Sequence, residues 1–181
     1  VKTADRTVVE QQAVVVVTVK AASSAGSSGP LDSKNHIPGP PTAVAFGGAL
    51  IERAGLTGSS DADTRSGTVI FADLNEGDSP TVKASFSSFT YKHALNTAVT
   101  ANLDATQLSA IKAVQVALVI TPDANNKNTG FATWTYSVGD QAFDFLAADE
   151  TLTLTYIAQV DNNFAQNNET TFVPFTIKIT G

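Results

Sequence analysis

The strongest constraint on the fold is a segment near the C-terminus in which apolar and polar side chains alternate. Residues 151–160 read TLTLTYIAQV. The apolar positions are Leu152, Leu154 and Tyr156, and the polar positions are Thr151, Thr153 and Thr155. Because successive side chains of a β-strand point to opposite faces of the sheet, this alternation predicts a strand with one buried face and one exposed face.

Other β-prone segments recur along the chain, separated by turn residues. They are residues 43–52, 67–71, 81–91, 131–138 and 170–180. The alternation within residues 81–91 changes phase at Ser87 and Ser88, which predicts a β-bulge there. Gly47 and Gly48 weaken the first of these segments, and Pro174 restricts the last one to a sheet edge or a bulge.

One segment departs from the strand pattern. Within residues 104–118, apolar side chains recur at helical spacing, at Leu108, Ile111, Val114 (or Gln115) and Leu118. Asp104 is a suitable N-cap, and Gln107, three residues later, completes a capping box. We therefore predict a helix of about three turns, with residues 116–120 as the start of the next strand.

These segments together predict the fold class. Six or seven short strands with turns at fairly regular intervals and one helix are typical of an all-β protein. We expect an immunoglobulin-like or cadherin-like antiparallel Greek-key β-sandwich with one inserted short helix.

The chain divides into three parts by composition. Residues 1–20 form a Val-rich segment, residues 21–42 are rich in Ser, Gly and Pro, and residues 43–181 read as one continuous domain. We interpret residues 21–42 as a linker, because a structureless stretch of this length is uncommon inside a compact domain. The alternative is an ordered loop within a single domain.

Charge and composition exclude several function classes. The net charge is −6, and an acidic surface repels phosphate backbones, so a nucleic-acid partner is not expected. The chain has no Cys, which excludes disulfides, thiolate metal sites and thiol nucleophiles. No run approaches the roughly 20 apolar residues of a membrane-spanning helix. The acidic surface is compatible with divalent cations such as calcium.

Five segments in order resemble a VCBS-type repeat, a cadherin-like module of large bacterial adhesins and secreted repeat proteins. They are LIERAGLTGSSDADTRSGTVIFADLNEGDSP at 50–80, FSSFTY at 86–91, LDATQLSAIKAV at 103–114, ATWTYSV at 132–138 and FDFLAADETLTLTYIAQVDNN at 143–163. The resemblance covers about residues 50–181. It implies an extracellular module of the bacterial cell surface, associated with adhesion and biofilm matrix, with calcium or polysaccharide bound by some relatives and no catalysis. The chain departs from the family pattern at Asn75 and Asp149.

A candidate calcium site follows the strand expected at 67–71. Asp73, Asn75 and Asp78 bring several oxygen ligands into one short loop, which is what calcium requires. Glu52 and Asp161 could add ligands if the fold gathers them at the same end of the sandwich, as could Asp61 and Asp63. The alternative is a polar β-turn, because Asp and Asn tolerate turn geometry.

The Val-rich N-terminal segment is a candidate assembly strand. Its β-branched members are Val8, Val9, Val14, Val15, Val16, Val17 and Val19. On a long tether, such a strand could complete the sheet of a neighbouring molecule by strand donation, and a head-to-tail repeat of that contact gives a filament. The alternatives are the last strand of a preceding repeat or the first strand of the same sandwich.

No catalytic constellation is found. His36 and His93 have no neighbouring nucleophile arrangement, and we interpret Asp144, Asp149 and Glu150 as capping and turn residues rather than a glycosidase carboxylate pair. We expect a structural or adhesive module, assembled with other copies or with neighbouring repeats. The alternative is a carbohydrate-binding module for matrix exopolysaccharide, with an aromatic platform built from Tyr91, Trp134, Tyr136, Tyr156 and Phe89.

Overall fold

A computed structural model describes residues 39–53, 55, 57–95, 97–164 and 168–181. All of these residues belong to one compact unit, which spans residues 31–181. The Val-rich segment and residues 21–38 of the expected linker lie outside the described residues.

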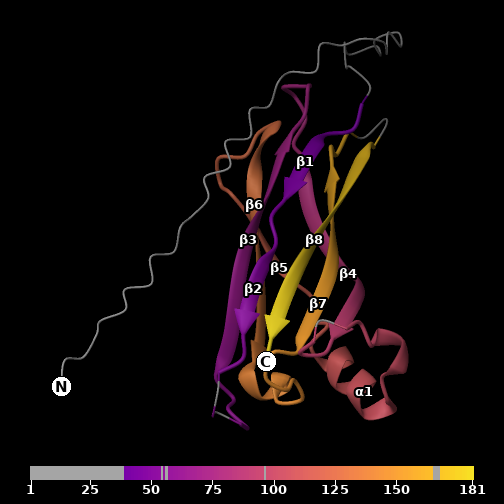
Figure 1. The fold of residues 1–181 in the computed structure, drawn as a ribbon. Coiled ribbons are helices and arrows are strands. Elements are labelled where there is room, and N and C mark those ends of the chain that lie inside the picture. Colours follow the sequence, from indigo (N-terminus) through magenta and orange to yellow (C-terminus); the bar gives the residue numbers. More distant parts are fainter. Residues whose placement is uncertain (1–38, 54, 56, 96, 165–167) are drawn as a thin grey trace, which may run out of the picture. The chain divides into compact units, whose positions relative to one another are not determined.

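Two four-stranded sheets pack face to face (Figure 1). The first sheet has the order β1-β3-β6-β5 and contains β1 (Thr42–Ala45), β3 (Ala62–Ala72), β6 (Thr129–Gly139) and β5 (Val119–Pro122). The second has the order β2-β8-β7-β4 and contains β2 (Gly48–Ile51), β8 (Thr170–Thr180), β7 (Thr151–Asp161) and β4 (Thr81–Lys92). This is the strand order of an immunoglobulin-like sandwich whose first strand is shared between the sheets, which confirms the predicted fold class.

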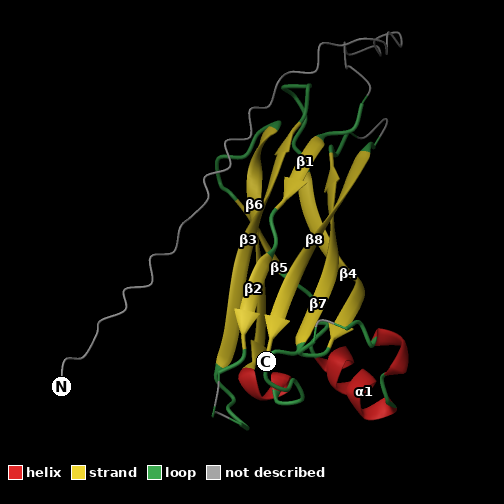
Figure 2. Ribbon diagram, in the orientation of Figure 1, coloured by secondary structure: helices red, strands yellow, loops and turns green. Residues whose placement is uncertain are grey.

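The helical segments gather at one end of the sandwich, beside the C-terminus (Figure 2). They are η1 (Thr100–Asn102), α1 (Ala105–Ala113) and η2 (Asp140–Phe143). We name this the helical end, and the opposite end, where β3 and β7 finish and β4 and β8 begin, the loop end. None of the described helices is long and apolar enough to cross a membrane.

The predicted capping box is present at the start of α1. The Asp104 carboxylate accepts from the Gln107 backbone N–H at 2.8 Å, and the Gln107 side chain accepts from the Asp104 N–H at 3.1 Å. The helix ends earlier than expected, at Ala113, and Leu108 is 45% exposed. Ile111 and Val114 are fully buried, so the helix meets the core through its last turn and not through Leu108.

The predicted strands β4, β7 and β8 are present with nearly the expected bounds. The segment expected at 43–52 instead forms two strands in different sheets, and the one expected at 67–71 is part of a longer strand, Ala62–Ala72. The apolar side chains expected on one face of β7 are fully buried, and the inner face of β6 is buried likewise: Leu152, Leu154, Tyr156, Ala132, Trp134 and Tyr136. The bulge in β4 lies between Phe86 and Ser88. Pro174 lies on β8, where β7 pairs with it on one side. On the other side β2 does not reach Pro174, because β2 pairs only with residues 177–180 of β8. The pair β2–β8 is parallel, whereas the other strand pairs are antiparallel.

The first strand changes sheets at Phe46 and Gly47, and Trp134 lies against this crossover. The Trp134 indole N–H donates to the Phe46 carbonyl at 2.8 Å, and the indole stacks on Phe175 with ring centroids 5.2 Å apart. A Cβ atom at Gly47 would lie 2.3 Å from the Thr176 carbonyl oxygen, and one at Gly67 would lie 2.4 Å from the indole ring. The glycines are therefore required because backbone and indole approach too closely for any side chain.

We predict that Gly67→Ala lowers the free energy of unfolding by about 1–3 kcal/mol, because the added methyl group overpacks the Trp134 ring. Urea unfolding followed by fluorescence of Trp134, the single Trp of the chain, measures this change. Gly77→Ala is the matched control, since a Cβ at Gly77 meets nothing within 4 Å, and it should change stability by less than about 0.5 kcal/mol. Equal effects of the two substitutions would contradict the close approach at Gly67.

Candidate functional site

The loop predicted to bind calcium connects β3 to β4 at the loop end of the sandwich. Asp73 and Asp78 are 6% and 7% exposed. The Asp73 carboxylate accepts from the backbone N–H of Asn75 at 2.8 Å and from its side-chain amide at 3.0 Å. The Asn75 amide also donates to Asp78 at 3.4 Å, and the Asp78 N–H donates to the Asn75 carbonyl at 3.1 Å. Asn75 thus joins the two carboxylates in an Asx turn, as the polar-turn alternative expects.

Asp161 lies at the same end, but its carboxylate organises a different turn. It accepts from the Asn163 N–H at 2.7 Å and from the Thr170 hydroxyl at 3.3 Å. A hydrogen bond of 3.0 Å from the Asn163 amide to the Ser79 carbonyl joins the two turns. The fold therefore brings Asp161 to the same end as the 73–78 loop.

Glu52 lies at the helical end, because β2 runs away from the loop end and the Glu52 N–H donates to the Thr180 carbonyl at 2.8 Å. Thr180 pairs with Thr151 at the start of β7, whereas Asp161 is at its finish. Ten residues of extended strand separate those positions by roughly 30 Å. The expectation that Glu52 shares an ion with the 73–78 loop is wrong, since strand direction puts it at the other end.

Among the described residues, no three His, Asp or Glu side chains are arranged to hold a metal ion. Calcium binding by Asp73, Asn75 and Asp78 therefore stays a prediction.

At the helical end, the structure pairs two buried carboxyl groups that sequence reasoning did not join. Asp63 is the second residue of β3 and is 6% exposed, and Asp140 begins η2 and is 1% exposed. One oxygen of each, Oδ2, is buried and has no hydrogen-bond partner. Arg53 lies 3.0 Å from Asp63 and offers its backbone N–H to Asp140 at 3.4 Å. One cation, Arg53, therefore compensates the negative charge of two buried carboxyl groups.

Burial and crowding of these acids change their proton affinity. Burial raises the pKa of Asp63, and the hydrogen bond that protonated Asp63 can donate to the Asp140 carboxyl raises it further, whereas Arg53 opposes both effects. Burial also raises the pKa of Glu52, and repulsion from Asp144 and Asp140 adds to it. The helical end therefore favours a proton or a cation between its carboxyl groups.

A sequence signal for the buried position of Asp63 exists. It has the same parity in β3 as Val69 and Phe71, which are both buried, so alternation points its side chain inward. Nothing in the sequence indicates Asp140 as its partner, because the contact depends on where the chain turns after β6.

The aromatic platform predicted for sugar binding does not form. Tyr91, Trp134, Tyr136 and Tyr156 are all at most 1% exposed, and Phe89 is half-buried. The hydroxyl groups of Tyr136 and Tyr156 donate to the carbonyls of the segment that follows α1, at 2.9 and 2.8 Å. The four buried rings are core residues, because alternation along their strands turns these side chains toward the interior of the sandwich.

Glu150 is held by neighbours other than a second carboxylate. It accepts from the Tyr91 hydroxyl and contacts His93 Nδ1 at 2.6 Å. Burial acts to raise the pKa of Glu150, but hydrogen bonds from Tyr91, the Ala147 N–H and His93 outweigh it and lower the pKa. Asp144 instead accepts from the Gly58 N–H at 2.9 Å. Only the bond from the Ala147 N–H to Glu150 is of the predicted turn type, whereas the other bonds join Glu150 and Asp144 to residues far away in the sequence.

We predict that Asp140→Asn raises the free energy of unfolding by about 1 kcal/mol near neutral pH, because it removes one buried charge and supplies a donor to Asp63. The raised pKa of Asp63 means that the protonated pair stabilises the wild-type fold at low pH. That contribution is complete below the unfolded pKa of about 3.9 and is lost as pH rises through the folded pKa. The advantage of Asp140→Asn should therefore shrink on acidification.

Urea unfolding at about pH 7 and about pH 4.5 measures this difference. Glu76→Gln is the control, because Glu76 is exposed and lies in the loop between β3 and β4 at the opposite end. A loss of stability at neutral pH in Asp140→Asn would show that the pair is not strained by repulsion.

Comparison with known proteins finds no matching family model and no matching curated protein. Among solved structures, AggA, the major subunit of aggregative adherence fimbriae type I from Escherichia coli, is similar with 14% identity, 78% of this chain and 93% of that chain covered, and a TM-score of 0.43. The match to the CooA pilin subunit of enterotoxigenic Escherichia coli has 12% identity and a TM-score of 0.29, and it covers 74% of this chain and 88% of that chain. The match to a family 123 glycoside hydrolase from Clostridium perfringens has 9% identity and a TM-score of 0.25, and it covers 73% of this chain and 22% of that chain. Identities and TM-scores this low do not assign a function to the chain.

Proposed function

We propose that the chain is a non-enzymatic structural subunit of an extracellular bacterial fibre, joined when the Val-rich strand of one copy pairs with β4 of the next. The observation that carries this proposal is the outer edge of β4, where the described residues place no strand beside residues 81–90. The strands of both described sheets lie within residues 42–180. The Val-rich segment is the strand that we propose to pair with this edge in a second copy.

The outer flank of β4 is the acceptor that we propose. Among the described residues, β4 pairs in its sheet with β7 alone. At its end, Lys92 forms a bridge with Ala98, and the Val99 N–H donates to the Tyr91 carbonyl at 3.1 Å. Residues 81–90 thus form an edge with no described strand beside it, longer than the seven-residue run AVVVVTV at 13–19. An edge of this kind is a template for an added strand.

The inner side chains of β4 are incompletely covered. Val82, Ala84, Phe86 and Phe89 contact the core but are only half-buried. A strand added beside β4 would cover part of this apolar surface, at about 25 cal/mol for each Å² removed from water. Val side chains on alternate positions of the donor suit such a surface, because β-branched residues pack well on a pleated sheet.

Two features of β4 restrict which strand can be added. The bulge between Phe86 and Ser88 interrupts the regular hydrogen-bond spacing, and Lys83 on the exposed face opposes close packing of a second sheet. These features limit indiscriminate pairing. They are compatible with one partner strand in one register, supplied on the 21-residue tether, residues 21–41, that precedes β1.

We predict that the full chain forms oligomers that grow with protein concentration and that a chain lacking residues 1–20 stays monomeric. Light scattering coupled to size-exclusion chromatography measures the mass of each. Val15→Lys combined with Val17→Lys should have the effect of the deletion, because charges on a donor strand oppose its burial. The same two charges placed at Ser24 and Ser28 of the linker form the control and should leave assembly intact. A full chain that is monomeric at every concentration contradicts the proposal.

A disulfide trap distinguishes exchange between copies from pairing within one chain. The chain has no Cys, so one copy that carries Val16→Cys and another that carries Ser85→Cys can join only to each other or to themselves. We expect the mixed disulfide to accumulate in the mixture. A double variant that forms only an internal disulfide would show that the strand pairs with its own sandwich.

We retain calcium in the 73–78 loop as a separate proposal, supported by the two carboxylates that Asn75 holds together. Calcium should then raise the melting temperature, and a chelator should remove that increase. Asp73→Asn should abolish the response, whereas Glu52→Gln, at the opposite end, should preserve it. An identical melting temperature with calcium and with chelator would overturn this proposal.

A further inference from the structure

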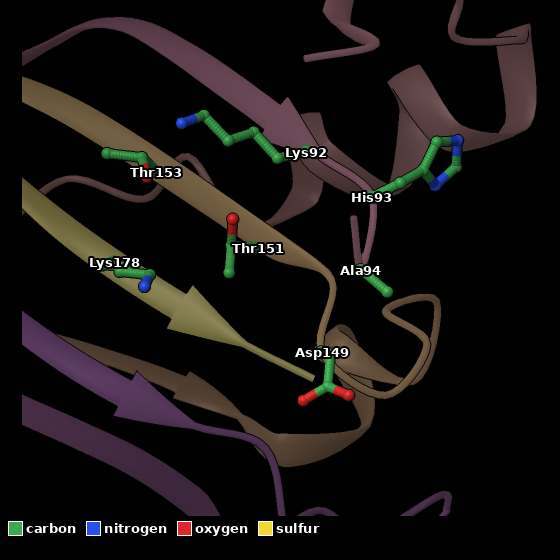
Figure 3. A pocket seen from close by; sticks show the side chains of 7 residues that line it. All are labelled: Lys92, His93, Ala94, Asp149, Thr151, Thr153 and Lys178. Carbon is green, nitrogen blue, oxygen red and sulfur yellow. The ribbon is translucent and has the colours of Figure 1, made fainter. Parts of the chain in front are cut away.

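A pocket of about 260 Å³ lies on the outer face of the β2-β8-β7-β4 sheet, near the helical end. Figure 3 shows its side chains, which come from β4, β7, β8 and the two neighbouring loops. Its lining residues are Lys92, His93, Ala94, Asp149, Thr151, Thr153 and Lys178. None of these residues belongs to the proposed acceptor edge, residues 81–90.

Strand register places a lysine on each side of the central strand of this pocket. Thr151 on β7 lies opposite Lys92 of β4, and Thr153 lies opposite Lys178 of β8. Neighbouring strands are about 4.8 Å apart, so both lysine side chains reach the space above the two threonine hydroxyls. The floor of the pocket therefore has hydroxyl groups between two flanking ammonium groups.

The pocket is electropositive on a chain that is acidic overall. The net charge is −6, yet the lining of this depression holds two lysines and a histidine against one carboxylate, that of Asp149. Lys178 forms no ion pair with any residue that the structure describes. His93 contacts Glu150 at 2.6 Å through Nδ1, which turns its other ring nitrogen away from that carboxylate. An anionic group is the ligand that such a site favours.

The remaining groups narrow the class of anion. Thr151 and Thr153 both donate and accept hydrogen bonds, and the Asp149 carboxylate accepts them from hydroxyl groups. His93 carries the one aromatic ring in the lining, so the pocket has no broad platform for stacking a nucleobase. The volume is below the range of about 300–1,000 Å³ that is usual for drug-sized ligands, which suits a single unit of a polymer. The ligand should therefore combine one negative charge with several hydroxyl groups.

We infer that this pocket binds a carboxylate-bearing sugar, a hexuronate unit of an acidic polysaccharide. Lys92 and Lys178 would bind the carboxylate, and the threonine hydroxyls and Asp149 would bind the sugar hydroxyls. The inference does not depend on fibre assembly, because every lining residue belongs to one sandwich. In this proposal, charged side chains recognise the sugar in place of the aromatic platform that the sequence predicted.

Isothermal titration of the full chain with a short oligogalacturonate tests the inference. We expect measurable binding that weakens as salt rises, since both lysines are near the surface. Lys178→Gln should weaken binding about threefold to fivefold, and the double variant with Lys92→Gln about tenfold or more. Lys83→Gln is the matched control, because Lys83 lies on the same exposed face of β4 but does not line the pocket.

Four results would overturn the inference. The first three are the absence of binding, equal binding of a neutral oligogalactoside of the same length, and an equal loss of affinity in Lys83→Gln. Equal binding of a sulfated glucan would show a general anion site and overturn the assignment to carboxylate. Thr153→Val keeps the shape of the side chain and removes one hydroxyl, so it should weaken oligogalacturonate binding without lowering the melting temperature.

Discussion

The indole of Trp134 donates its hydrogen bond to the Phe46 carbonyl at the point where the first strand leaves one sheet and joins the other. The arrangement of the two sheets as one sandwich depends on that crossover. Because β1 pairs with β3 and β2 pairs with β8, one short stretch of chain connects the two sheets. The Phe46 carbonyl at this change of direction accepts from the fully buried Trp134 indole, so both polar groups have a partner.

The same indole begins a row of aromatic rings across the core. It stacks on Phe175 at 5.2 Å, and Phe175 stacks on Tyr156 at 5.9 Å. Tyr156 meets Phe86 edge to face at 5.7 Å, which carries the row to β4 at the edge of the second sheet. Packing at the crossover is therefore continuous with the half-buried apolar surface of β4. A strand added at that edge would extend a core that already reaches it.

Charge is distributed unevenly over the two ends and the outer face. Carboxylates at the loop end accept turn hydrogen bonds, whereas those at the helical end are crowded around Arg53. Lys92 and Lys178 lie instead on the outer face of the second sheet, across β7. Only 15% of the residues are charged, so few opposite charges are available nearby to neutralise each of these groups.

The sequence by itself determined the local structure of this protein. Alternation at 151–160 identified the inner face of β7, the change of phase at Ser87 and Ser88 identified the bulge, and Asp104 with Gln107 identified the start of α1. Each of these signals concerns residues only a few positions apart, and backbone geometry couples such residues directly. The fold class followed from the number and spacing of these elements.

Only the tertiary structure decided which distant residues meet. It separated Glu52 from Asp161, joined Asp63 to Asp140, and placed Lys178 across β7 from Lys92. These results depend on strand order, direction and register, which are set by long-range pairing and not by the local pattern. The hydrogen bonds of the buried tyrosines illustrate the same limit. Alternation turned Tyr136 and Tyr156 inward, but their acceptor carbonyls, at Val114 and Val116, depend on where the segment after α1 packs.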